Sequence, residues 1–125
     1  MLFDTDIFIW VQRGNPKAAA KINIAQDRYL SIQSYMELLQ CAVNKKQHHF
    51  IKNFLIDFDF AVLPLTENIG HRAAVYIEEY SLSSGLRAGD AIIAATAVEN
   101  NIPLMTSNIK HFKSINELLL KGFQP

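Results

Sequence analysis

The chain opens with Met1-Leu2-Phe3-Asp4-Thr5-Asp6, a short apolar run that ends at two carboxylates. We interpret Met1–Asp4 as a buried strand, followed by a helical turn over Ile7–Val11. Two further isolated acids, Glu37 and Asp90, also lie beside or inside apolar segments. An unpaired carboxylate is costly to bury, so acids in such places need a positive partner. A hard divalent cation, which prefers oxygen ligands, is the simplest candidate.

The composition predicts one globular domain over residues 1–125. Half of the residues are hydrophobic and 19% are charged, which argues against disorder. The 12 Lys and Arg balance the 12 Asp and Glu, so any contact with nucleic acid must be local rather than driven by bulk charge. The single cysteine, Cys41, is expected to be buried in a reduced cytoplasm. No basic leader precedes the first run, and the longest apolar stretch, Ala91–Val98, is too short for a bilayer; we expect a cytoplasmic protein without membrane contact.

Strand-like and helix-like segments alternate along the chain, which predicts an α/β domain with a mostly parallel sheet. Besides Met1–Asp4, strands are expected at Tyr29–Ile32, Phe60–Leu63, Ile102–Thr106 and somewhere in Leu118–Phe123. Helices are expected from Pro16, from Ser34 to about Val43, and over about Gln47–Ile56, Glu67–Tyr80 and Asp90–Asn100. Ser81–Gly85 is expected to be a loop.

The candidate site residues follow the predicted strands, where parallel sheets gather their functional groups. Asp4 ends the first strand, Ser34 and Glu37 follow the second, and Thr106-Ser107-Asn108 ends the fourth. Each residue also has a purely structural interpretation. Asp4 and Asp90 could be helix N-caps, Ser34 and Glu37 a capping box, and Thr106 and Asn108 a turn.

Four segments in order resemble the PIN-domain ribonucleases, and among them the VapC-type toxins of bacterial toxin–antitoxin pairs. They are Leu2-Phe3-Asp4-Thr5-Asp6, Ser34-Tyr35-Met36-Glu37-Leu38, the stretch from Leu86 to Ala97 around Gly89-Asp90-Ala91, and Pro103 to Phe112 with Thr106-Ser107-Asn108. Each segment alone is weak, but together they extend over nearly the whole chain. The resemblance implies a three-layer α/β/α sandwich with a central, mostly parallel sheet of four to five strands.

The resemblance further implies a metal-dependent endoribonuclease, the toxin of a type II pair, in which Asp4, Glu37 and Asp90 bind Mg²⁺ or Mn²⁺. The family's fourth acidic position is Asn108 here, which adds an oxygen but no charge. We expect Asp4 and Asp90 to contact the metal, and Glu37 to orient or deprotonate its water or to be a ligand. We expect Thr106 and Asn108, with Asp6 and Ser34, to support them.

The expected partners are RNA, a small antitoxin protein and a second copy of the chain. Arg87 could contact the RNA backbone or be a solvated loop residue. An antitoxin could dock an amphipathic helix on the helices after the second strand and place a basic side chain among the acids.

Two other functions remain open from the sequence. Asp4-Thr5-Asp6 also fits the Asp-x-Asp fragment of haloacid-dehalogenase-like phosphatases, although the second acid expected after Asp90 is absent and the chain is short for that fold. A catalytically inert RNA-binding PIN module is the other alternative. No Gly-x-Gly-x-x-Gly or P-loop motif is present, which excludes the common nucleotide-binding folds.

Overall fold

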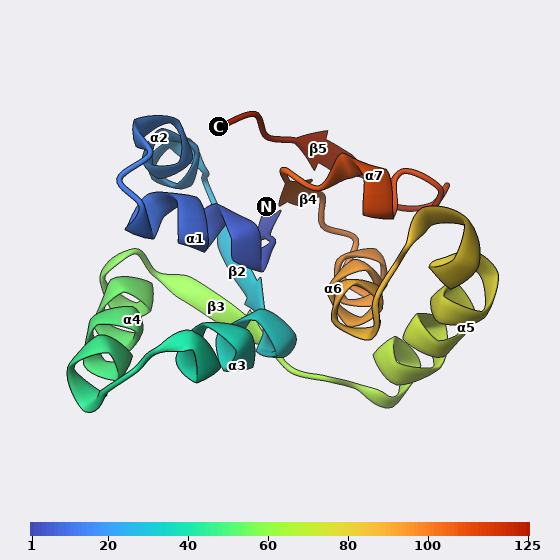
Figure 1. Ribbon diagram of the computed structural model, residues 1–125, viewed down its shortest axis with the longest axis horizontal. Coiled ribbons are helices and arrows are strands. Elements are labelled where there is room, and N and C mark those ends of the chain that lie inside the picture. Colours follow the sequence, from blue (N-terminus) through green and yellow to red (C-terminus); the bar gives the residue numbers. More distant parts are fainter.

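A computed structural model describes residues 1–125 and has a five-stranded, all-parallel sheet in the order β3-β2-β1-β4-β5 (Figure 1). The strands are β1 (Leu2–Phe3), β2 (Arg28–Ser31), β3 (Phe60–Leu63), β4 (Leu104–Thr106) and β5 (Leu120–Gly122). The helices are α1 (Thr5–Gln12), α2 (Pro16–Ile24), α3 (Ile32–Cys41), α4 (Lys45–Asp57), α5 (Glu67–Ser84), α6 (Ala88–Glu99) and α7 (Ile109–Phe112). The predicted α/β/α architecture is confirmed.

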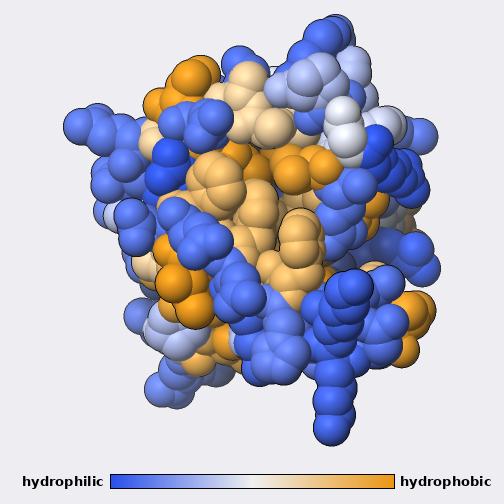
Figure 2. Space-filling view, turned by 90° about the vertical axis from the view of Figure 1, so that its left-hand side faces the viewer, coloured by the Kyte–Doolittle hydropathy of each residue, from blue (hydrophilic) through white to orange (hydrophobic).

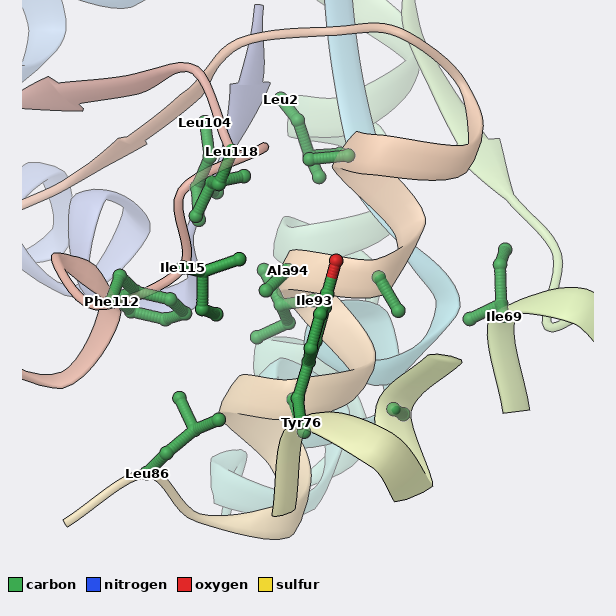
Figure 3. Close-up of a cluster of buried hydrophobic side chains, with 14 residues drawn as sticks. Leu2, Ile69, Tyr76, Leu86, Ile93, Ala94, Leu104, Phe112, Ile115 and Leu118 are labelled. Atoms are coloured by element: carbon green, nitrogen blue, oxygen red, sulfur yellow. The ribbon is translucent and has the colours of Figure 1, made fainter. Parts of the chain in front are cut away.

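The two faces of the sheet bury separate hydrophobic cores because neighbouring residues of a strand point to opposite faces. Leu2 of β1 and Leu104 of β4 face α5, α6 and α7 (Figure 3). Phe3 and Met105, the next residue in each strand, face α1, α2, α3 and α4 instead. The central strands β1 and β4 are therefore buried throughout, as expected for a parallel sheet that is covered on both sides, and Thr106 at the end of β4 is their one polar residue.

A network of hydrogen bonds and ion pairs connects helices α5 and α6 to the segment that precedes β5. Arg72 of α5 donates to Glu99 of α6 at 2.5 Å and to Glu117 at 2.7 Å, and Tyr76 also donates to Glu117. These side chains are partly exposed, so the network contributes orientation more than stability.

Several predicted boundaries were wrong, for identifiable reasons. Helix α3 is capped by Ser31 rather than Ser34: the Ser31 hydroxyl accepts from the Ser34 N–H at 3.0 Å, so the helix begins directly at the end of β2. Glu37 is therefore inside α3 and forms no capping box. Helix α6 begins at Ala88, which places Asp90 within its first turn rather than at its cap.

The segment predicted as the loop Ser81–Gly85 is mostly the last turn of α5, which ends at Gly85 with φ of 72°. Glycine adopts this left-handed conformation without steric cost and commonly ends helices. Cys41 is exposed, contrary to expectation, because it lies at the end of α3. The short helix α7 was not predicted. No helix of the protein is long and apolar enough to cross a membrane.

Candidate active site

Asp4 and Thr106 lie side by side at the carboxyl ends of the adjacent strands β1 and β4. The Asp4 N–H donates to the Met105 carbonyl at 2.9 Å, which continues the pairing of the two strands. Asp4 Oδ1 accepts from the Thr5 N–H at 2.7 Å, and Oδ2 accepts from the Thr106 hydroxyl at 2.8 Å. Asp4 thus caps α1, as its structural interpretation required, and is also fixed at the sheet edge where the site was predicted.

The Asp4 carboxyl group is in an environment that opposes its charge. It is 6% exposed, and its pKa is raised to about 7, from an ordinary 3.8. Burial is the largest cause of this shift; the nearby carboxylates of Asp6 and Asp90 add to it, and the hydrogen bonds from Thr106 and the Thr5 N–H oppose it. Asp4, Asp6 and Asp90 are therefore close enough for their charges to interact.

Asp6 supports this edge from the first turn of α1. Its Oδ2 accepts from the Ser107 N–H at 2.9 Å and from the Ser107 hydroxyl, and it lies 3.4 Å from the Thr106 hydroxyl. Its Oδ1 is buried and has no hydrogen-bond partner. A buried carboxylate oxygen without a donor is unfavourable, so this atom is a place where a cation or an ordered water would lower the free energy.

A buried group of hydroxyls continues from Asp4 toward β2. The Thr5 hydroxyl donates to Ser34 Oγ at 2.8 Å, and the Ser31 hydroxyl lies 3.2 Å from the same oxygen. All three residues are buried. Ser34 therefore reaches the acidic residues only through Thr5, whose backbone N–H is bound to Asp4.

Asp90 forms a second group with residues that follow β4. Its Oδ2 accepts from the Arg87 N–H at 3.2 Å and lies 3.0 Å from His111 Nδ1. The same Nδ1 is 2.8 Å from Asn108 Nδ2, and the Asn108 N–H donates to the Thr106 hydroxyl at 3.0 Å. Asn108 thus connects the two groups through Thr106. The Arg87 side chain is exposed and makes no hydrogen bond. This position is compatible both with a contact to the RNA backbone and with a solvated loop residue.

Glu37 approaches from α3 and is close to the first turn of α6. Its Oε1 accepts from Gln33 Nε2 at 3.2 Å. The same oxygen would be only 3.5 Å from a Cβ placed on Gly89, and Gln33 Nε2 would be 3.2 Å from it. A Cβ at Gly89 would make ordinary contact with Glu37 and would require the Gln33 side chain to shift slightly, so the glycine leaves room for this pair beside the residue that precedes Asp90.

His111 and Gln33 belong to this site but were not predicted from the sequence. Gln33 lies one helical turn before Glu37, and this spacing is a weak signal for a paired side chain. His111 follows Asn108 at the spacing of one helical turn, but the short helix that creates this proximity was not recognised. Both residues contact predicted site residues rather than forming a separate site.

The donor set fits a hard divalent cation, although no three His, Cys, Asp or Glu side chains are arranged to hold a metal ion as they stand. The fit rests on the unpartnered Asp6 Oδ1, and on the burial and charge repulsion that raise the pKa of Asp4. A bound cation would relieve both. The carboxylate, amide and hydroxyl oxygens of this edge are ligands of the type that Mg²⁺ and Mn²⁺ prefer.

Comparisons with known proteins agree with the predicted resemblance. The PIN domain profile matches residues 1–118. A chain of a toxin–antitoxin complex from Klebsiella pneumoniae is 28% identical, with a TM-score of 0.75, over 94% of this chain and 93% of that chain.

Two further solved structures share the fold. A chain of VapBC-1 from nontypeable Haemophilus influenzae is 24% identical, with a TM-score of 0.77, over 97% of this chain and 96% of that chain. A chain of VapBC2 from Rickettsia felis, in a structure bound to a promoter DNA fragment, is 19% identical, with a TM-score of 0.81 over 98% of both chains. The comparison with curated proteins gave no match. The family profile matches almost the whole length, and the chain therefore belongs to the PIN domain family.

Proposed function

We propose that the protein is a Mg²⁺- or Mn²⁺-dependent endoribonuclease and the toxin of a toxin–antitoxin pair. The observation that carries this proposal is the concentration of Asp4, Asp6 and Asp90 at the carboxyl edge of the sheet, where burial and the neighbouring negative charges together raise the pKa of Asp4 to about 7. Similarity to chains of toxin–antitoxin complexes supports the toxin assignment.

In this proposal Asp4 and Asp90 hold the cation, and Glu37 lies beside them to orient or deprotonate the attacking water. When bound, such an ion lowers the pKa of water and neutralises charge on the scissile phosphate. Thr106 keeps Asp4 in place through its hydroxyl, and Asn108 keeps Thr106 in place through its backbone N–H. The exposed guanidinium of Arg87, at the start of α6, is available to a phosphate of the RNA.

The proposed reaction is tested with purified protein and a labelled single-stranded RNA. Wild-type protein should cleave the RNA internally with Mg²⁺ or Mn²⁺, and Asp4→Asn should lose at least about 100-fold in rate. Zn²⁺ and Ca²⁺ should support cleavage poorly. A chromogenic phosphomonoester separates the alternatives: its turnover without RNA cleavage would indicate a phosphatase, and RNA binding without cleavage of either substrate would indicate an inert module.

The antitoxin is proposed to dock in an apolar groove between α1, α3 and α4. The groove has a volume of about 510 Å³ and is lined by Ile9, Leu38, Phe50 and Ile51 among others. Figure 2 shows apolar side chains gathered in a hollow on this side of the molecule, bordered by hydrophilic ones. Phe50 is 62% exposed, which is unusual for a large aromatic side chain without a partner.

One end of the groove lies beside the acidic residues because Thr5, which follows Asp4, also lines it. A partner helix in the groove could therefore extend a basic side chain toward Asp4. The apolar contacts would supply most of the affinity and the charge pair the specificity.

The docking proposal is tested by co-expression with the product of an adjacent short open reading frame. Wild-type protein should slow growth and Asp90→Asn should not, and the partner should relieve the slowing. Phe50→Asp should remain an active ribonuclease that the partner no longer silences. The control Ile24→Asp, at an exposed residue of α2 that does not line the groove, should still be silenced. Equal slowing by wild type and Asp90→Asn would refute the toxin assignment, and normal silencing of Phe50→Asp would refute the groove.

A homodimer through α5 is also proposed. Val75 and Leu82 of α5 are 46% and 101% exposed, and α5 lies on the opposite side of the molecule from α4 in Figure 1. Dimerisation there would leave the groove open. Light scattering of wild type and Leu82→Asp should show a dimer and a monomer, respectively, and a wild-type monomer at micromolar concentration would refute the proposal.

A further inference from the structure

His111 lies between the acidic residues and the end of α5, in a position that the sequence did not predict. Its Nδ1 is 3.0 Å from Asp90 Oδ2 and 2.8 Å from the amide nitrogen of Asn108. The opposite edge of the ring faces Gly85, where a Cβ would be 3.7 Å from Nε2 and 3.9 Å from Cδ2. The next residue, Phe112, is fully buried and fixes the backbone of α7.

The two neighbours of Nδ1 make opposite demands on the tautomer of the ring, because the Asp90 carboxylate needs a donor whereas the Asn108 amide nitrogen, as it lies, is itself a donor. A carboxylate oxygen can only accept a hydrogen bond, so the contact with Asp90 is favourable only if Nδ1 carries the proton. The same Nδ1–H can also be shared with Asn108 if its amide turns so that the oxygen faces the ring. The opposite tautomer would place a lone pair against the Asp90 carboxylate and is therefore disfavoured.

The hydrogen bond determines which oxygen of Asp90 remains available. Oδ2 accepts from the Arg87 N–H at 3.2 Å and from His111, whereas Oδ1 makes no hydrogen bond within the protein. Donors from two different segments, the start of α6 and the short helix α7, hold the same oxygen. The carboxylate is thereby prevented from rotating, and Oδ1 is the atom left to bind a ligand.

We propose that His111 is a positioning residue, which orients Asp90 through an Nδ1–H hydrogen bond and so presents Oδ1 to the metal. Its effect on catalysis rests on the proposed function, but the orientation itself does not. Residues that orient metal ligands by hydrogen bonds commonly change metal affinity by about 10- to 100-fold. His111 belongs to this class rather than to the ligands.

The orientation is tested on the metal-free protein by the ¹⁵N–¹H NMR spectrum of the imidazole rings at a pH of about 8, where a free imidazole is neutral. The chain has four histidines, so assignment by single substitution is practical. His111 should be the Nδ1–H tautomer, and Asp90→Ala should abolish this preference. An Nε2–H tautomer for His111 in the wild type would overturn the proposal, whether or not the protein cleaves RNA.

The consequence for the metal is tested by Mn²⁺ titration with EPR detection. His111→Ala should weaken Mn²⁺ binding about 10-fold and lower kcat similarly, with KM for RNA within about twofold. His111→Asn, whose amide nitrogen can occupy the position of Nδ1, should restore affinity to within about threefold, whereas His111→Gln should not. His71→Ala is the matched control, because His71 is an exposed residue of α5, and it should behave as wild type.

Two results would overturn the role proposed for His111. Wild-type Mn²⁺ affinity in His111→Ala would show that it does not position Asp90. A directly bonded nitrogen in the pulsed EPR spectrum of the Mn²⁺ complex, lost in His111→Ala, would show that it is a ligand instead. Neither readout requires RNA cleavage, so a failed ribonuclease assay would refute the proposed function without deciding the role of His111.

Discussion

Replacing Asp4 by Asn should stabilise the metal-free protein at neutral pH, although it removes a residue of the proposed site. The Asp4 carboxyl binds its proton more tightly in the folded protein, with a pKa of about 7 against the ordinary value of 3.8. At about 1.4 kcal/mol per pKa unit, this difference corresponds to at most about 4 kcal/mol. Its stabilising contribution is complete below a pH of about 4 and is lost as the pH rises toward 7.

The Asn side chain can keep most of the contacts of Asp4. Its amide oxygen can accept from the Thr5 N–H, and its amide nitrogen can donate to the Thr106 hydroxyl, which currently donates to Asp4. We therefore expect Asp4→Asn to be more stable than wild type by about 2 to 4 kcal/mol at pH 7.5, and to differ little at pH 4. For a domain of this length, the gain corresponds to roughly 10 °C in Tm.

The assay is urea unfolding of both proteins in chelator at several pH values between 4 and 8. Asp57→Asn is the control, since Asp57 is an exposed acid at the end of α4 and should change stability by less than about 0.5 kcal/mol. Added Mn²⁺ should stabilise the wild type and not Asp4→Asn. A variant that is less stable than the wild type at pH 7.5 would refute the electrostatic reasoning.

Three further predictions concern the same structure. Asp90→Asn and Glu37→Gln should each lower the rate of RNA cleavage by at least about 100-fold, while the circular dichroism spectrum stays that of the folded wild type. Full activity in either variant would show that the replaced residue is not part of the site. Asn108→Asp should tighten Mn²⁺ binding and Asn108→Ala should weaken it, because the Asn108 side chain lies beside His111, which contacts Asp90. If neither substitution changes the Mn²⁺ titration, Asn108 is a turn residue and not part of the metal site. The hydrogen bond from Tyr76 lowers the pKa of Glu117, so Glu117→Gln should cost less than about 1 kcal/mol at pH 7. This cost should decrease as the pH falls below the ordinary pKa of a glutamate, and a cost that does not change with pH in urea unfolding would contradict this assignment.

The sequence was sufficient to predict the architecture because hydrophobic periodicity and the ends of the strands are local signals. Asp4 and Thr106 could be placed together for this reason: both follow apolar runs of strand length, and parallel strands end at a common edge. The start of α3 could not be predicted, since Ser31 and Ser34 are both good N-caps and only the observed end of β2 selects Ser31.

The contacts of His111 could not be predicted either, because they depend on a four-residue helix without a hydrophobic period. The approach of Gln33 and Glu37 to Gly89 is a packing relationship between α3 and α6 that a single sequence does not reveal. Tertiary packing therefore decides how the site is supported, whereas local sequence predicts the carboxylates themselves.

The carboxylates at the edge of β1 and β4 are proposed to bind a divalent cation on which RNA cleavage depends. The most direct test is to measure Mn²⁺ occupancy and RNA cleavage in the same samples across a titration of metal-depleted wild-type protein. We predict that the rate follows occupancy, and that Asp90→Asn loses both together. Undiminished cleavage in excess chelator, with contaminating nuclease excluded, would contradict the claim.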